Sequence, residues 1–281
     1  MSTSSVYKST EGKNSILTVY DSLLEKWPIP IEKRNLKTRH GDTFVIAGGD
    51  TSLPPLILLH GSSSNSAIWI GDIAEYTKNY RVYCVDLPGE PEKSADIRPD
   101  LTTSAYSDWM NDVLNKLEID KASFVGISLG GWLALKYAIV YPEKIDKMAL
   151  LCPTGIGPQK ASFILFALPL KLLGKWGEVQ AIKMVMGTKE ISDETIEYSR
   201  LIAENYTPFK GTVPVFSDEE LQHLTMPILL ITGSKDVLIN SPKTVARAKK
   251  AFPHVQIILL PEAGHGLIDQ RERIIKFLRK N

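Results

Sequence analysis

A serine set between glycines, at a change from strand to helix, constrains the fold of this chain more than any other segment. The residues are Gly126-Ile127-Ser128-Leu129-Gly130, with Gly131 directly behind them. The run before them, 122–125, is β-branched and aromatic, and the run after them, 132–138, is a good helix former. Larger neighbours would collide with the strand and helix, so the turn needs glycine on both sides. The sequence predicts a strained strand-turn-helix unit with an exposed serine hydroxyl.

Such a turn also arises by chance, so it indicates chemistry only if its partners are present. A nucleophilic serine needs a base, an acid that orients the base, and N–H groups that bind an oxyanion. His265 is the candidate base, because it lies in a glycine-flanked loop after the apolar run 255–260. A lone loop histidine is more often a helix cap, but its place after the last predicted strand favours the base.

The candidate acid is Asp236, which follows the apolar run 226–233 through a short loop. A buried carboxylate there would accept the Nδ1 hydrogen of His265 and stabilise the imidazolium. The alternative is an Asp turn or a helix cap. Glu262 and Asp269 lie closer to His265 in sequence, but neither directly follows the acid strand. The predicted chain order is Ser128, Asp236, His265.

The oxyanion site is expected in the early loop His60-Gly61-Ser62-Ser63-Ser64, which follows the apolar run 56–59. Backbone N–H groups in this loop can point at a developing alkoxide, and the second donor is the N–H of Leu129, next to the serine. Ser62 is the first choice for the loop donor, and Ser63 is the second. We expect His60 to brace the loop through hydrogen bonds.

Taken together, these motifs resemble those of the α/β-hydrolase family from about Arg39 onward. The flanking segments Trp27-Pro28-Ile29 and 216–221 are similar to the bacterial carboxylesterase NP-type branch. That branch is named for hydrolysis of carboxylic esters, including arylpropionate esters. The resemblance implies a serine hydrolase that cleaves an ester through an acyl-enzyme.

Other activities of the same residues stay open. They are C–C bond hydrolysis, thioester cleavage, acyl transfer, or ligand sensing by a weakly catalytic protein. A serine at the turn disfavours dehalogenase and epoxide hydrolase mechanisms, which need a carboxylate nucleophile. The sequence has no His-Glu-x-x-His and no Cys-x-x-Cys, and it lacks phosphate-loop and dinucleotide spacings. We therefore expect no metal and no cofactor.

Alternating strand and helix patterns predict an α/β fold, with a mostly parallel sheet covered by helices on both faces. The pattern breaks after the strand ending near Cys152, where we expect a helical cap to be inserted. The expected division is a core of 1–154, with an N-terminal helical extension over 1–34, then a cap of 155–216 and a second core part of 217–281. Among individual helices we expect 15–26, 68–77 and a closing helix over 267–278. In the helix 242–251, we expect the basic residues, Arg247 included, to form a solvated face.

The cap opens with a richly apolar run. Phe163, Phe166 and Met184 are candidates to line a lipophilic site, although such side chains could equally cement the cap to the core. The predicted partner is therefore a small ester, and a lipophilic one. Whether the chain self-associates stays open.

Composition excludes several other classes. Lys and Arg number 33 against 32 Asp and Glu, so the net charge is +1. This balance does not indicate a basic surface for binding nucleic acid. No apolar run reaches the length of a membrane span. The two cysteines lie in apolar strands, and the start lacks a secretory signal. These features predict a soluble cytoplasmic protein.

Overall fold

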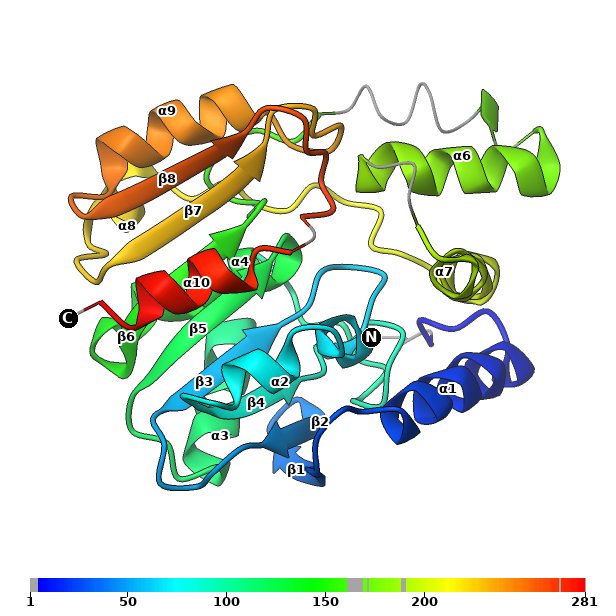
Figure 1. Cartoon of the computed structure of the whole chain (residues 1–281), viewed down its shortest axis with the longest axis horizontal. Helices are drawn as coiled ribbons and strands as arrows, with labels where there is room; N and C mark the ends of the chain where they lie inside the picture. Colours follow the sequence, from blue (N-terminus) through cyan, green and yellow to red (C-terminus); the bar gives the residue numbers. More distant parts are fainter. Residues whose placement is uncertain (1–4, 161–168, 171, 188–190, 268, 281) are drawn as a thin grey trace.

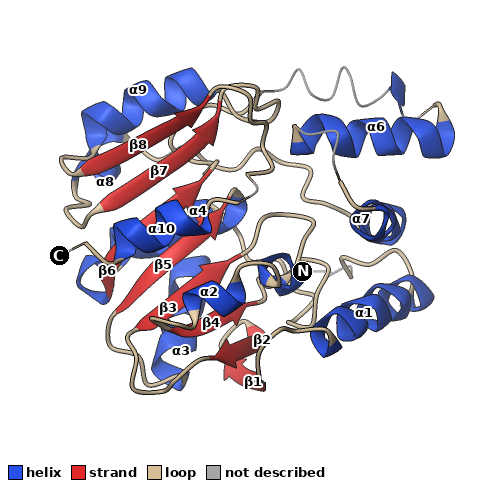
Figure 2. Cartoon of the chain, in the orientation of Figure 1, coloured by secondary structure: helices blue, strands red, loops and turns tan. Residues whose placement is uncertain are grey.

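A single sheet organises the chain (Figures 1 and 2). The computed structural model describes residues 5–160, 169–170, 172–187, 191–267 and 269–280. The strands in these ranges are β1 (Ile31–Thr38), β2 (Gly41–Gly48), β3 (Pro55–Leu59), β4 (Arg81–Val85), β5 (Ala122–Ile127), β6 (Ile145–Leu151), β7 (Ile228–Gly233) and β8 (Val255–Leu260). Their order is β1-β2-β4-β3-β5-β6-β7-β8; β1 and β2 are antiparallel to their neighbours, and the pairs from β4 to β8 are parallel. The predicted mostly parallel sheet is confirmed.

Helices cover both faces of this sheet. The described helices are α1 (Thr10–Glu25), η1 (Ser66–Trp69), α2 (Ile73–Tyr76), α3 (Ala105–Lys116), α4 (Leu129–Val140), η2 (Pro142–Lys144), α6 (Gly174–Met186), α7 (Asp193–Asn205), α8 (Asp218–Gln222), α9 (Ser241–Ala251) and α10 (Arg271–Leu278). Side chains of α3, α4, α8 and α9 join one apolar core, and those of α1, α2 and α10 join another. Strand β4 contributes side chains to both cores, because Tyr83 and Val85 face the first and Val82 and Cys84 face the second.

Three helices differ from their predicted bounds. Helix α1 begins at Thr10, five residues before the predicted start, because the Ser9 side chain accepts the Gly12 N–H and caps it. The predicted helix 68–77 is divided into η1 and α2. The closing helix α10 begins at Arg271, since Asp269 has a φ of 55°, which an α-helix cannot contain.

The helices α6 and α7 stand apart from the sheet, beyond the carboxyl ends of the central strands (Figure 1). The two ends of the segment that contains them meet, because the Phe216 N–H donates to the Gly155 carbonyl over 2.9 Å. Arg247 of α9 holds both ends by donating to the carbonyl oxygens of Ile156 (2.7 Å) and Phe216 (2.5 Å). The expectation that Arg247 is only solvated is therefore wrong.

The N-terminal segment pairs with the end of helix α7. Tyr7 forms an antiparallel bridge with Tyr206, which directly follows α7, and their neighbours exchange further backbone hydrogen bonds. The buried side chains of Val6, Tyr7, Ile16, Ile202 and Tyr206 form a small core of their own. The extension does not reach residue 34, because β1 already begins at Ile31. None of the helices in the described ranges is long and apolar enough to cross a membrane.

Candidate active site

Ser128 occupies a strained turn between β5 and α4. Its φ of 52° and ψ of −108° lie in a region that residues with a Cβ rarely adopt. A Cβ at Gly126 would lie 2.6 Å from the Gly130 carbonyl oxygen, and one at Gly130 would lie 2.5 Å from the His60 oxygen. Larger residues at these positions would push the strand and the helix apart. The serine itself is half-buried and its N–H donates to the Leu151 carbonyl over 2.9 Å.

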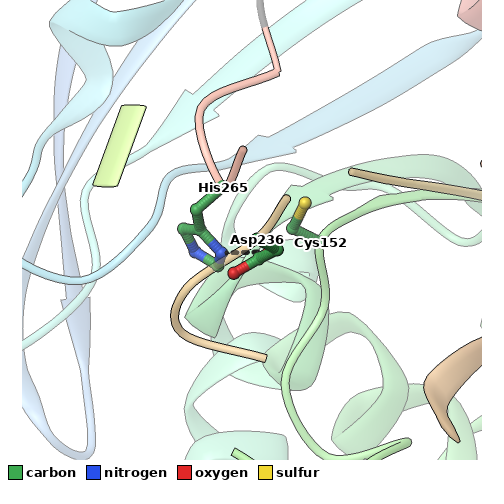
Figure 3. Close-up of side chains that lie close together, drawn as sticks. All are labelled: Cys152, Asp236 and His265. Atoms are coloured by element: carbon green, nitrogen blue, oxygen red, sulfur yellow. Dashed lines mark hydrogen bonds and ion pairs between the residues drawn. The ribbon is translucent and has the colours of Figure 1, made fainter. Parts of the chain in front are cut away.

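Asp236 and His265 are in contact. The Nδ1–H of His265 donates to Oδ2 of Asp236 over 2.7 Å, and both residues are buried (Figure 3). The second carboxylate oxygen, Oδ1, accepts the backbone N–H groups of Leu238 (2.7 Å) and Ile239 (3.0 Å). The bond to Asp236 leaves Nε2 of His265 as the nitrogen that can act as a base.

Burial alone would raise the pKa of Asp236. The hydrogen bond and charge of His265, together with the two backbone donors, outweigh it, so the pKa lies below its ordinary value. The carboxylate therefore stays ionised at neutral pH. The alternative acids lie in different surroundings: Glu262 is exposed and pairs with Lys235, and Asp269 is exposed and pairs with Arg271.

The sheet brings the loops after β5, β7 and β8 to one edge. Parallel strands expose their carboxyl ends on the same side, and β6 lies between β5 and β7 in the sheet. The pairing continues past the strand ends, since the Cys152 N–H donates to the Ile231 carbonyl over 2.8 Å. Ser128, Asp236 and His265 follow these three strands at the same edge.

The oxyanion loop candidate passes beside Ser128. A Cβ built on Gly61 would lie 3.6 Å from the Ser128 Cβ, which is an ordinary contact distance. His60 is fully buried; its Nδ1–H donates to the Gly61 carbonyl over 2.8 Å, and its Nε2 accepts the Leu87 N–H over 3.1 Å. Burial lowers the pKa of His60, so the ring is neutral and braces the loop.

The two candidate loop donors differ. The Ser63 N–H donates to Oε2 of Glu90 over 2.6 Å and is therefore already engaged. Ser63 also has a φ of 56°. This arrangement favours Ser62 over Ser63 as the source of the free N–H.

Of the cap candidates, Phe163 and Phe166 lie outside the described residues. Met184 is half-buried on α6. The end of that helix contacts the loop of His265, whose N–H donates to the Val185 carbonyl over 3.0 Å. A Cβ at Gly266 would lie 2.8 Å from the sulfur of Met186, so Met186 is the methionine that packs against this loop.

Comparison with known proteins gives the family. The model of the alpha/beta hydrolase fold matches residues 54–183. An uncharacterized carboxylesterase of Bacillus subtilis, nap, is 30% identical, and the match covers 92% of this chain and 90% of that protein. The chain belongs to the α/β-hydrolase fold family.

Two solved structures place it more narrowly within this α/β-hydrolase family. Carboxylesterase CesB (YbfK) from Bacillus subtilis is 28% identical with a TM-score of 0.86, over 96% of this chain and 99% of that one. Naproxen esterase (carboxylesterase NP) from the same organism is also 28% identical with a TM-score of 0.86, over 97% and 100%. The resemblance to the NP-type branch and the predicted fold class are confirmed.

Within this α/β-hydrolase, two groups of described residues place metal-ligand atoms within 4.8 Å of one another. The first is Cys152, Asp236 and His265 (Figure 3), where Nδ1 is used in the hydrogen bond and burial raises the pKa of the thiol, disfavouring a thiolate ligand. The second is His60, Asp86 and Glu92, where Nε2 of His60 accepts a backbone N–H. In both groups a histidine nitrogen is engaged, so the donor chemistry argues against a metal.

Sequence reasoning missed Glu90, which lies beneath the candidate oxyanion loop of this α/β-hydrolase. In sequence it is a charged residue in a glycine- and proline-containing turn, which is typical of a solvated loop. In the structure it is 4% exposed and bonds to Ser63. The one available signal was the apolar strand β4 just before it, because residues after buried strands line the carboxyl edge of the sheet.

Proposed function

We propose that this protein is a carboxylesterase that cleaves a carboxylic ester through an acyl-enzyme. The observation that carries the proposal is the pairing of a strained serine turn with a buried Asp236–His265 hydrogen bond of 2.7 Å. The names of the similar Bacillus proteins, which are carboxylesterases, support the same reaction. They do not favour C–C cleavage, thioester cleavage or acyl transfer.

In the first half-reaction, the Ser128 hydroxyl attacks the ester carbonyl while Nε2 of His265 takes its proton. Asp236 holds the imidazole in the required tautomer and stabilises the imidazolium. The N–H groups of Ser62 and Leu129 bind the oxyanion of the tetrahedral intermediate. Its collapse breaks the ester C–O bond, and His265 gives the proton to the departing alcohol. Water then attacks the acyl-enzyme by the same route, and a carboxylic acid leaves.

We propose further that residues 155–216 form a cap over this site and that the preferred esters are lipophilic. The meeting of Gly155 and Phe216 at 2.9 Å supports an insertion with adjacent ends. The contact of the end of α6 with the His265 loop supports a cap that borders the site. On this account residues 1–154 and 217–281 form the core.

A panel of p-nitrophenyl esters, from acetyl to lauroyl, tests the proposal. We expect turnover that depends on Ser128, with kcat/KM rising as the acyl chain lengthens, because more apolar surface is buried. The Ser128→Ala variant serves as the blank, and Ser22→Ala, at an exposed position of α1, serves as the matched control. A maximum at acetyl would overturn the lipophilic preference. Absence of turnover on every ester, in folded protein, would favour a ligand-sensing role.

A further inference from the structure

A buried carboxyl group lies directly under the oxyanion loop. Glu90 follows β4 and is 4% exposed, whereas Ser62 and Ser63 above it are exposed. An acidic side chain is almost never buried this deeply without partners, because removing it from water is costly. Its partners therefore indicate what the side chain does.

The first partners are in the oxyanion loop. Oε2 of Glu90 accepts the backbone N–H of Ser63 over 2.6 Å. The hydroxyl of Ser62 lies 3.4 Å from Oε1 and 3.3 Å from Oε2. Glu90 thus holds both Ser62, whose N–H is the proposed oxyanion donor, and the next residue, Ser63. It also stabilises Ser63 in a backbone conformation, φ 56°, that would otherwise be strained.

The second set of partners belongs to the end of α7. The hydroxyl of Tyr206 donates to Oε2 of Glu90 over 2.9 Å. Arg98 donates from one nitrogen to the Tyr206 hydroxyl (2.8 Å), the Thr207 carbonyl (3.0 Å) and the Gly89 carbonyl (2.9 Å). The single carboxylate oxygen Oε2 therefore joins the proposed oxyanion loop to the residue that directly follows α7 within the proposed cap.

We propose that Glu90 is a positioning residue that fixes the oxyanion loop in its catalytic geometry and links that loop to the end of α7. The proposal rests on the function proposed above. Glu90 acts through Ser62 and Ser63 and does not touch the substrate. Its carboxylate form is the effective one, because hydrogen bonds to an ionised acceptor are about twice as strong as those to a neutral one.

The ionisation of Glu90 makes this role measurable. Burial raises its pKa to about 7, against the lowering effect of its hydrogen-bond donors and of Arg98. The titratable and charged groups around it are Arg98, Tyr206, Tyr106 of α3 and Glu92 of the same loop. Because the pKa lies near neutrality, the loop should pass from weakly held to firmly held as pH rises through about 7.

The test compares wild type with Glu90→Gln over a range of pH. We divide the kcat/KM of wild type by that of the variant at each pH. The titration of His265 affects both proteins, so it cancels in this ratio. We expect a ratio near one at about pH 5.5, where Glu90 is protonated and resembles glutamine, and about tenfold at about pH 8.5. The loss should lie in kcat, with KM changed less than about twofold, because the oxyanion forms only in the transition state.

Two further variants sharpen the result. Glu92→Gln is the matched control, because this residue is 1% exposed and lies beside Asp86 in the same loop region as Glu90. Burial and nearby Asp86 raise its pKa well above the ordinary value, so the glutamine replaces an already neutral acid and the ratio should stay flat. The hydrogen bond from Tyr206 lowers the pKa of Glu90 in the wild type. Tyr206→Phe removes this bond, so the pKa of Glu90 and the midpoint of the pH profile should both rise.

A ratio that stays at one across the pH range, with melting temperatures that show both proteins folded, would overturn the proposal. A change confined to KM would also overturn it and would point to substrate binding. If Glu90→Gln does not fold, the Tyr206→Phe variant decides. A pH profile of kcat/KM with the same midpoint as wild type would then contradict the positioning role of Glu90. Hydrolysis that persists in Ser128→Ala instead contradicts the proposed function, so the two failures are distinguishable.

Discussion

At Ser128, the backbone adopts a conformation that only tight surroundings can maintain. Because glycines lie on both sides of the serine, the strand, the helix and the candidate oxyanion loop can come into contact with one another. A Cβ on Gly131 would lie 2.9 Å from the Cβ of Pro153, so this third glycine has the same purpose. Packing at these three glycines thus maintains the strained backbone conformation of the serine.

Asp236 is the residue whose role the sequence left most open. If it orients His265, Asp236→Asn should lower kcat by as much as ~10⁴-fold, as loss of the orienting carboxylate does in other triads. Glu262→Gln is the matched control, because that side chain is exposed and should change kcat little. Steady-state kinetics on one activated ester check this. Near-normal activity in Asp236→Asn, together with collapse in the Glu262 variant, would show that the acid has been assigned incorrectly.

The residues near the site differ in how far the sequence could predict them. Asp236 and His265 follow apolar strands through short loops, so their edge of the sheet was predictable from the chain alone. Glu90 was not, because its burial depends on Tyr206 and Arg98, and Tyr206 lies 116 residues away along the chain. The choice between Ser62 and Ser63 likewise needed the Ser63–Glu90 hydrogen bond, which no local pattern encodes.

Among the elements, α1 and α7 form a unit that the sequence did not predict. The antiparallel bridge between Tyr7 and Tyr206 has no local signal, since each residue would fit an ordinary loop. The amphipathic pattern predicted the existence of α1 but not its partner. Its Ile16 is fully buried against the end of α7, and Tyr20 of the same helix bonds to Asp86 over 2.8 Å.

This packing predicts that α1 stabilises the proposed cap. Ile16→Ala should lower the free energy of unfolding by about 2–5 kcal/mol, the usual cost of emptying a buried isoleucine site. It should also speed proteolytic cleavage within 187–217, because the α1 contacts of α7 are weakened. Thr18→Ala, at an exposed position of the same helix, is the control. Thermal melting and limited proteolysis measure the two effects. Loss of stability without faster cleavage in that segment would separate α1 from the cap.

In the whole molecule, the order of the strands determines where chemistry is possible. Strand β6 lies between β5 and β7, and β8 continues the same parallel run, so three loops far apart in sequence meet at one edge. Apolar runs made β5 and β7 predictable, because strands buried on both faces need no polar alternation. Helix ends were less predictable: α10 begins late because of the backbone at Asp269.

The proposed reaction requires Ser128 to be a nucleophile that His265 and Asp236 activate. An organophosphonate probe, followed by intact-protein mass measurement and peptide mapping, tests it most directly. We expect stoichiometric labelling of wild type on the peptide that contains Ser128. We expect no labelling and no turnover in a folded Ser128→Ala variant. Labelling that persists at another serine in that variant would show that Ser128 is not the nucleophile.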